Sequence, residues 1–155
     1  MQDELKIAII QADLVWENPL KNRYPFLVKI EALPEDIDLI ILPEMFTTGF
    51  TMNAEAVAET MEGDTLKWMQ YLAVKKQAAI VGSIIIKENN NFYNRLFFVH
   101  PSREIEYYDK RHTFTLVGEH KVFASGTKKL IVNYKGWKIC PLICYDLRFP
   151  VWSRN

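Results

Sequence analysis

DLIILPEM, residues 38–45, is an apolar run that ends in Pro43 and Glu44. A run of this kind suits a short strand that is buried on both faces of a sheet. KIAIIQADL, residues 6–14, begins with a similar run and predicts a second strand of the same type. Strands buried on both faces need helices or a further layer to cover them, so the two runs favour an α/β fold.

Two helices are expected around these strands. Asn18 is a candidate N-cap and Pro19 suits the first helical position. Apolar residues follow at mostly helical spacing, and Pro25 interrupts them, so it is expected to kink that helix or to shift its start. The first set is Leu20, Tyr24, Leu27, Val28 and Ile30. A second helix is expected over residues 64–77, with Leu66, Met69, Tyr71, Leu72 and Ala73 facing inward.

The rest of the chain predicts mostly strands. They are expected over residues 78–87, 92–100, 104–108, 129–134 and 137–143. The polar turn at Asn89-Asn90-Asn91 joins the first two strands in a hairpin, and Lys135-Gly136 is expected to join the last two. Hairpins are antiparallel, whereas the earlier alternation of strand and helix favours parallel pairs, so the sheet is predicted to be mixed.

Length and composition indicate one folded domain over residues 1–155. Hydrophobic residues make up 49% and charged residues 25%, and Lys+Arg 19 balance Asp+Glu 19, so no nucleic-acid partner is expected. No segment approaches the roughly 20 apolar residues that cross a membrane, and the start lacks a secretory pattern. Two cysteines suit a reducing compartment, so the protein is expected to be cytoplasmic.

Cys144 is the first candidate for a catalytic side chain. It follows the strand-like ICPLI and precedes a turn, where a nucleophile is exposed and the N–H groups after it can face an oxyanion. Free Cys is more often a small buried hydrophobe, which stays an alternative for Cys144 and is the expectation for Cys140. The two lie about 13 Å apart along a strand, too far for a disulfide.

Glu44 and Lys110 also follow predicted strands. The Glu44 carboxylate could act as a general base. The Lys110 ammonium would lower the pKa of a neighbouring thiol and stabilise an oxyanion. Glu119 could orient Lys110 or the substrate. Each of the three, taken singly, also suits a surface position.

The histidines and glycines give no sign of a cofactor. His100, His112 and His120 show no spacing that would form a zinc site with the cysteines. A nucleophilic Cys–His pair with His112 or His120 stays open, because neighbours in space need not be neighbours in sequence. Since no glycine-rich nucleotide motif occurs, we expect no nucleotide cofactor.

Four segments in this order resemble the nitrilase (carbon-nitrogen hydrolase) superfamily. They are DLIILPEMFTTGF around Glu44, YYDKRHTF around Lys110, GEH at Glu119 and ICPLICYDLRFPVWSRN around Cys144. The opening KIAIIQADLVWENP is similar too, so the resemblance runs essentially from end to end. Within the superfamily the segments look most like the omega-amidase branch, which acts on 2-oxoglutaramate-type substrates.

The resemblance implies a fold and a set of roles. The fold would be an α-β-β-α sandwich with mixed sheets, paired into a homodimer in the complete protein. Neither a metal nor an organic cofactor is implied. By resemblance Cys144 would be the nucleophile, Glu44 the general base, Lys110 the oxyanion stabiliser, Glu119 a supporting glutamate and the Tyr145 N–H a second oxyanion donor.

Three more side chains are candidates for the pocket. Arg148 would anchor a substrate carboxylate through a bidentate pair, or else brace Asp146 as a structural ion pair. Phe50 and Phe114 would line the pocket or pack in the core.

The implied reaction is hydrolysis of a small carboxylate-bearing amide to acid and ammonia through a cysteine thioester. Aliphatic amidase, N-carbamoylase and nitrilase activities are alternatives that the sequence separates poorly. A further alternative is a catalytically inert fragment or interaction module. Because the family domain is longer than this chain, residues 1–155 are expected to be its N-terminal portion, with the sandwich incomplete.

Overall fold

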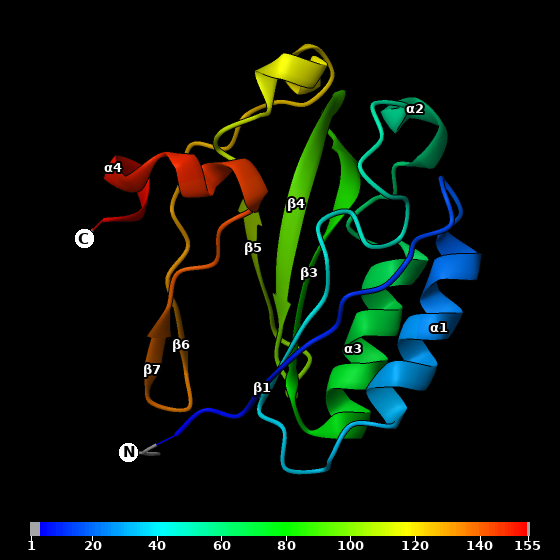
Figure 1. Ribbon diagram of the computed structural model, residues 1–155, viewed down its shortest axis with the longest axis vertical. Helices are drawn as coiled ribbons and strands as arrows, with labels where there is room; N and C mark the ends of the chain where they lie inside the picture. The colour runs from blue at the N-terminus through cyan, green and yellow to red at the C-terminus, as the bar shows by residue number, and fades with distance from the viewer. Residues whose placement is uncertain (1–3, 155) are drawn as a thin grey trace.

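A five-stranded mixed sheet forms the centre of the computed structural model, which describes residues 4–154 (Figure 1). The strands β1 to β3 run parallel, and β4 and β5 are antiparallel to their neighbours. In spatial order they are β1 (Ile7–Ile9), β2 (Leu39–Ile41), β3 (Ala79–Glu88), β4 (Asn91–Val99) and β5 (Ile105–Asp109). The predicted α/β class and mixed sheet are therefore confirmed.

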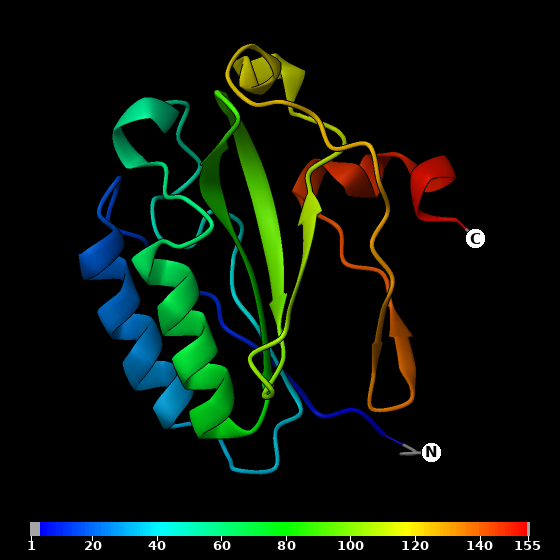
Figure 2. The same ribbon diagram turned by 180° about the vertical axis from the view of Figure 1, so that it is seen from behind.

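Two helices cover one face of the sheet. α1 (Pro19–Glu31) and α3 (Asp64–Lys76) lie side by side there, as Figures 1 and 2 show from opposite directions. A first core fills the space between helices and sheet, and its fully buried members include Phe26, Ile30, Met69, Leu72, Ile80 and Phe97. The short helix α2 (Ala54–Val57) lies in the connection between β2 and α3.

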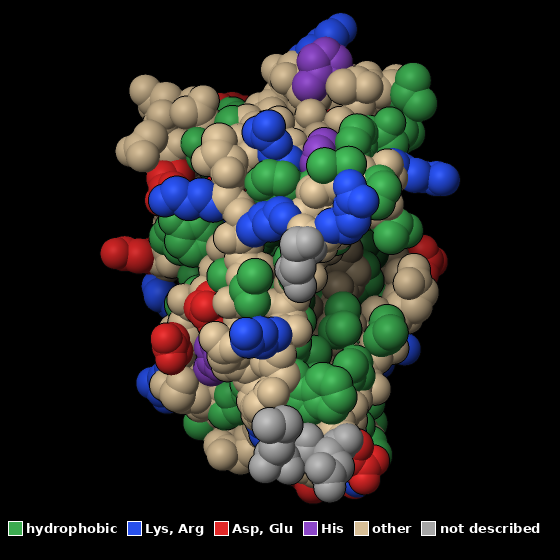
Figure 3. Space-filling view, turned by 90° about the vertical axis from the view of Figure 1, so that its left-hand side faces the viewer, with side chains coloured by type: hydrophobic (Ala, Val, Ile, Leu, Met, Phe, Trp, Pro, Cys, Tyr) green, Lys and Arg blue, Asp and Glu red, His purple; other side chains and the backbone are tan. Residues whose placement is uncertain are grey.

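The opposite face of the sheet carries a smaller layer. It contains the hairpin β6 (Val132–Tyr134) and β7 (Trp137–Ile139), then the 3₁₀ turn η3 (Cys144–Arg148) and α4 (Pro150–Ser153). The Tyr134 hydroxyl donates to the Asp38 carbonyl at 2.9 Å and accepts from the Ala79 N–H at 3.2 Å. These bonds tie β6 to the sheet. Figure 3 looks onto this layer and shows Lys and Arg side chains across the level of α4, with hydrophobic side chains below.

The predicted helix after Asn18 is confirmed, but its apolar residues face both ways. The Asn18 side chain accepts from the Lys21 N–H at 3.1 Å, and the helix continues through Pro25. Phe26 and Ile30 are buried, whereas Leu20 and Tyr24 are 72% and 68% exposed. Periodic spacing alone therefore identified the helix without identifying its buried side.

The second predicted helix is also confirmed. Leu66, Met69, Leu72 and Ala73 face the core as expected. The inward orientation expected for Tyr71 is wrong, because its side chain is 56% exposed on the outer side of α3. There the Lys75 ammonium lies 5.9 Å from the centre of its ring.

The strand expected over residues 6–14 is shorter and less buried than predicted. β1 extends only over Ile7–Ile9, and Ile7 and Ile9 are 48% and 75% exposed. Ile7 and Ile9 share one face of this edge strand and are exposed, whereas Ile10 on the other face is buried under the helices, so burial on both faces was the wrong expectation. The apolar run signals a strand here but not a central one.

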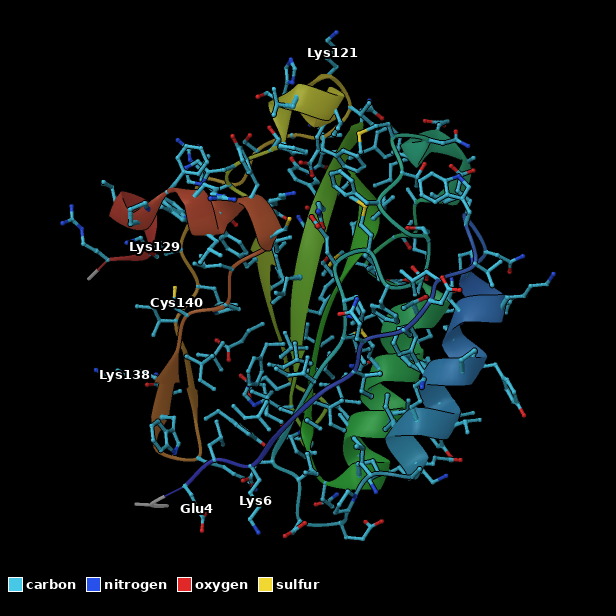
Figure 4. All side chains as sticks on the ribbon, in the orientation of Figure 1. Glu4, Lys6, Lys121, Lys129, Lys138 and Cys140 are labelled. Atoms are coloured by element: carbon cyan, nitrogen blue, oxygen red, sulfur yellow. The ribbon has the colours of Figure 1, made fainter. Side chains whose placement is uncertain are left out.

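Both predicted hairpins form. Asn89 and Asn90 have φ of 49° and 63°, and Lys135 and Gly136 have φ of 49° and 86°, the paired positive values of a tight hairpin turn. β7 ends at Ile139, so the strand expected to reach residue 143 stops early. Cys140 is exposed on the outer side of this layer, which corrects its expected burial (Figure 4). In residues 4–154 no helix has the length and apolar character to cross a membrane.

Candidate active site

Three strands place polar side chains at the same end of the sheet, where β2 and β5 finish and β4 begins. Glu44 comes three residues after β2, Asn94 lies near the start of the antiparallel β4, and Lys110 directly follows β5. The Lys110 N–H donates to the Asn94 carbonyl at 3.0 Å, which continues the β4–β5 pairing by one residue. Because β4 runs antiparallel to β3 and β5, its start lies at the same end of the sheet as the ends of β2 and β5.

Lys110 is buried between two carboxylates. Its Nζ lies 2.8 Å from Oε1 of Glu44 and 3.0 Å and 2.9 Å from the two oxygens of Glu119. The Phe50 ring covers the ammonium at 5.0 Å, so Phe50 lines the site. Burial alone would lower the pKa of Lys110, but the charges and hydrogen bonds of Glu44 and Glu119 outweigh it and raise that pKa. Lys110 is therefore a cation at neutral pH.

Glu119 is held from two directions. It begins η2 (Glu119–Lys121), its side chain is fully buried, and besides Lys110 it accepts from the backbone N–H of Phe114. η1 (Thr115–Val117) separates Phe114 from Glu119 and folds the segment back on itself. The structure thus brings Glu119 to Lys110, in the geometry expected of a residue that orients the lysine.

Cys144 stands at a sharp backbone turn. It is the first residue of η3 and has φ of 43°, a left-handed value that a side chain rarely adopts without a structural reason. Cys144 is exposed, and its thiol lies close enough to Glu44 for that carboxylate to change its pKa. Partial burial of the sulfur and the negative charge of Glu44 raise the pKa of Cys144 more than Lys110 lowers it. The lowering expected from Lys110 is present, but burial and Glu44 outweigh it, so Cys144 rests as a thiol.

Asp146 anchors the Cys144 turn, a role that the sequence did not reveal. Its fully buried carboxylate accepts from the Ile143 N–H at 3.1 Å and the Tyr108 hydroxyl at 2.8 Å on one oxygen. The His112 N–H, at 2.9 Å, and His112 Nδ1, at 2.8 Å, contact the other. Burial and Asp146 raise the pKa of Tyr108, which keeps it a donor. The turn is thereby fixed to the end of β5.

Asn94 is the second residue that sequence reasoning missed. Its Nδ2 donates to Oε1 of Glu44 at 2.8 Å and lies 3.5 Å from Oε1 of Glu119. Its position in an ordinary strand pattern gave no signal. The clue would have been a polar residue on the β4 face that carries buried Leu96 and Phe98.

A hollow of about 650 Å³ opens beside Cys144. It is lined by Phe114, Leu116, Cys144, Tyr145, Leu147 and Arg148. The Tyr145 ring packs against Phe114 at a centroid distance of 4.9 Å. Arg148 is exposed at this hollow, and within the described residues no ion pair joins it to Asp146, so the bracing alternative is not what the structure shows.

The predicted residues thus divide into two groups. Glu44, Lys110, Glu119 and Cys144 converge, and Phe114, Tyr145 and Arg148 border the hollow beside them. His112 contacts Asp146 instead of pairing with the thiol, and His120 and Lys121 lie on the exposed surface of η2, where Figure 4 labels Lys121. Residues 4–154 contain no group of three or more His, Cys, Asp or Glu side chains placed to hold a metal ion.

The fold and the site together define a class of protein. A mixed sheet is covered by helices, and two glutamates, a lysine and a cysteine meet at one end of it. The chain belongs to the carbon-nitrogen hydrolase family, whose sequence profile matches residues 6–155. It is 42% identical to omega-amidase YafV of Escherichia coli (strain B / BL21-DE3) over 151 residues, which cover 97% of this chain and 58% of that protein. It is 31% identical to 2-oxoglutaramate amidase of Bacillus subtilis (strain 168), covering 96% and 59% respectively.

Solved structures agree with this assignment. XC1258 from Xanthomonas campestris, a CN-hydrolase superfamily protein with an arsenic adduct in its active site, superposes with a TM-score of 0.96. It is 42% identical and the match covers 99% of this chain and 58% of that one. The nitrilase-type fold expected from the sequence is confirmed. The chain spans less than two thirds of the length of these relatives.

Proposed function

We propose that the full-length protein hydrolyses a small carboxylate-bearing amide of the 2-oxoglutaramate type to the acid and ammonia. The observation that carries the proposal is the convergence of Glu44, Lys110 and Glu119 beside the Cys144 thiol. The names of two relatives, omega-amidase and 2-oxoglutaramate amidase, support the choice of substrate class.

The first half of the reaction forms a thioester. Glu44 takes the proton from Cys144 Sγ, and the sulfur attacks the amide carbon. The carbonyl oxygen becomes an oxyanion, which the Lys110 ammonium and the Tyr145 N–H stabilise. The tetrahedral species collapses, Glu44 returns the proton to the leaving nitrogen, and ammonia departs.

The second half releases the acid. Glu44 takes a proton from a water molecule, which attacks the thioester carbon, and the same two donors hold the new oxyanion. Collapse breaks the carbon–sulfur bond, and the proton on Glu44 returns to the sulfur. Because the thiol is regenerated, no oxidant, reductant or cofactor enters the balance.

The raised pKa of Cys144 agrees with this order of events. A resting thiol needs a base at the moment of attack, and the Glu44 carboxylate is the nearby group that can act as one. The Lys110 ammonium donates hydrogen bonds to Glu44 and Glu119 and stays protonated. It therefore stabilises the oxyanion by its charge, without exchanging a proton.

Arg148 is the proposed contact for the carboxylate of the substrate. It is a cation at the rim of the hollow that contains Cys144, and Phe114 and Tyr145 form the aromatic part of the same lining. A guanidinium can grip a carboxylate with two parallel hydrogen bonds.

Ammonia release from 2-oxoglutaramate by the full-length protein tests the proposal. We expect Cys144→Ala to abolish it and Cys140→Ala, the matched exposed thiol, to leave it intact. Equal release by Cys144→Ala would overturn the mechanism. Preference for a simple aliphatic amide, an N-carbamoyl amino acid or a nitrile in the same assay would replace the substrate class.

Assembly and location are separate proposals. The homodimer and the cytoplasmic location expected from the sequence stay predictions. Sedimentation of the full-length protein tests the first, and cell fractionation tests the second.

A further inference from the structure

Asn94 is a buried polar side chain of the site for which the reaction above gives no role. It is 1% exposed, and its Nδ2 lies 2.8 Å from Oε1 of Glu44. The amide nitrogen must point this way, because both carboxylates near it are hydrogen-bond acceptors and would repel the amide oxygen. The orientation of Asn94 is thus set by Glu44 and Glu119.

The other end of the amide has no such partner. Within the described residues, Asn94 Oδ1 is the buried side-chain atom that lacks a hydrogen-bond partner. A buried acceptor without a donor costs about 1–3 kcal/mol, so such groups in folded proteins call for an explanation. An apolar residue would suit this face of β4 at least as well, so stability does not account for Asn94.

The hydrogen bonds to Glu44 are unevenly divided between its oxygens. Oε1 accepts from Lys110 Nζ at 2.8 Å and from Asn94 Nδ2 at 2.8 Å. Two donors fill the two lone-pair positions of a carboxylate oxygen. The oxygen that stays available to the Cys144 thiol is therefore Oε2.

We propose that Asn94 is a positioning residue that fixes Oε1 of Glu44 and so makes Oε2 the oxygen that takes the Cys144 proton. This inference rests on the proposed function, because it takes Glu44 to be the base. The proton leaves Sγ for Oε2 and passes from Oε2 to the departing nitrogen, and no further reagent is needed.

A neutral amide suits this role better than a charged side chain. A second cation beside Lys110 would stabilise the ionised carboxylate further and weaken it as a base. An acid in the same place would repel both glutamates. Asn94 supplies a donor and leaves the charge of the site unchanged.

The main test uses two variants of similar size. Asn94→Leu removes the donor, and Asn94→Asp replaces it with an acceptor. We expect kcat for the amide to fall by about 10- to 100-fold, because a misplacement of about 1 Å costs about 100-fold, with KM within about threefold. The acid limb of the pH profile should move to higher pH in the order wild type, Asn94→Leu, Asn94→Asp, an order that loss of packing would not produce.

Two controls separate position from folding. Asn91→Leu and Asn91→Asp alter an exposed asparagine on the same strand, whose side chain contacts the Asn89 carbonyl at 3.2 Å, and both should behave as wild type. If the larger variants do not fold, Asn94→Ser and Asn94→Ala leave cavities of similar size, and Ser, which keeps a donor, should retain the higher kcat. Equal kcat for this pair, or wild-type kcat in Asn94→Asp, would overturn the inference.

Alkylation of Cys144 by iodoacetamide distinguishes the two proposals. If wild type releases no ammonia from any amide, the proposed function fails but the geometry can still be tested. Asn94→Leu and Asn94→Asp should then slow alkylation at neutral pH by about threefold or more, since an ill-placed base assists the thiol less well. Unchanged rates in both variants would sink the role of Asn94 whatever the substrate.

Discussion

Lys110 donates from Nζ to both oxygens of Glu119, at 3.0 Å and 2.9 Å, and neither side chain is more than 1% exposed. A buried ion pair of this kind adds little stability in itself, because both charges lose their water. Breaking it is a different matter, since the remaining charge then has no counterion. The pair therefore makes the centre of the site sensitive to removal of either member.

Lys110→Met should lower the free energy of unfolding by about 3–5 kcal/mol, because Glu119 would be left as an unpaired buried charge. Urea denaturation at neutral pH measures this loss. Lys121→Met, at an exposed lysine of η2, is the control and should be close to wild type. The double variant Lys110→Met/Glu119→Gln should lose less stability than Lys110→Met alone. A loss equal to the sum of the two single-variant losses would contradict the pairing.

The same pair predicts a dependence on high pH. The folded-state pKa of Lys110 is raised by its carboxylates, so its stabilisation is complete below the unfolded lysine value of about 10.4 and is lost as pH rises through the higher folded value. The stability difference between wild type and Lys110→Met should thus stay constant from neutral pH to about pH 9 and shrink above about 10.4. A difference that shrinks already near neutral pH would argue against a charged Lys110.

Glu44→Gln should lower the pKa of Cys144. Burial and the negative charge of Glu44 raise it in the wild type, and the substitution removes the charge while Lys110 stays in place. The ultraviolet absorbance of the thiolate during a pH titration, corrected with Cys144→Ala, gives the midpoint. A midpoint that moves upward would mean that the thiol and Glu44 do not interact as described.

Asp146→Asn should destabilise the Cys144 turn by about 2–3 kcal/mol, because an amide cannot accept from both the Ile143 and the His112 backbone N–H groups. Urea denaturation measures the loss. Asp36→Asn, which alters an exposed partner of Lys6, is the matched control and should change stability little. Stability equal to wild type in Asp146→Asn would show that the network does not hold the turn.

Gly126→Ala should be among the most disruptive single changes near the site. A Cβ at Gly126 would lie 2.0 Å from the carbonyl oxygen of Asp109, and the Gly126 N–H donates to the Lys110 carbonyl at 2.9 Å. We expect a loss of about 3 kcal/mol or more, with displacement of Lys110. Gly118→Ala, with φ of +80° but no atom nearer than 3.9 Å to the added Cβ, should lose only about 1 kcal/mol. The reverse ranking in thermal or urea unfolding would contradict this account.

Local chemistry explains which parts of the fold were predictable. The Asn18 cap, the Asn89-Asn90 turn and the Lys135-Gly136 turn are each set by a few neighbouring residues, so the sequence displays them directly. Tyr71 and the burial of β1 depend on which neighbours a segment finds in space. Periodicity identifies a helix or a strand, but it does not place a strand at the edge of a sheet.

The candidate site shows the same division. Glu44, Lys110 and Cys144 stand out because each lies in a recognisable segment that follows a predicted strand. Asn94 acts through its contact with Glu44, 50 positions away in the sequence, and Asp146 through its contact with Tyr108, 38 positions away. Nothing in the local sequence of either residue marks these partners. The net shift in the pKa of Cys144 was not predictable for a related reason, because the sequence does not reveal whether Glu44 or Lys110 dominates at the sulfur.

The Glu44–Lys110 contact joins residues that are 66 positions apart. The chain must close long loops before such a contact can form, and that loss of chain entropy slows folding relative to proteins built on local contacts. Helical circular dichroism from α1 and α3 needs no such closure. Recovery of the Glu44–Lys110–Cys144 cluster during refolding is consequently a stricter criterion of a correctly folded molecule than recovery of its helices.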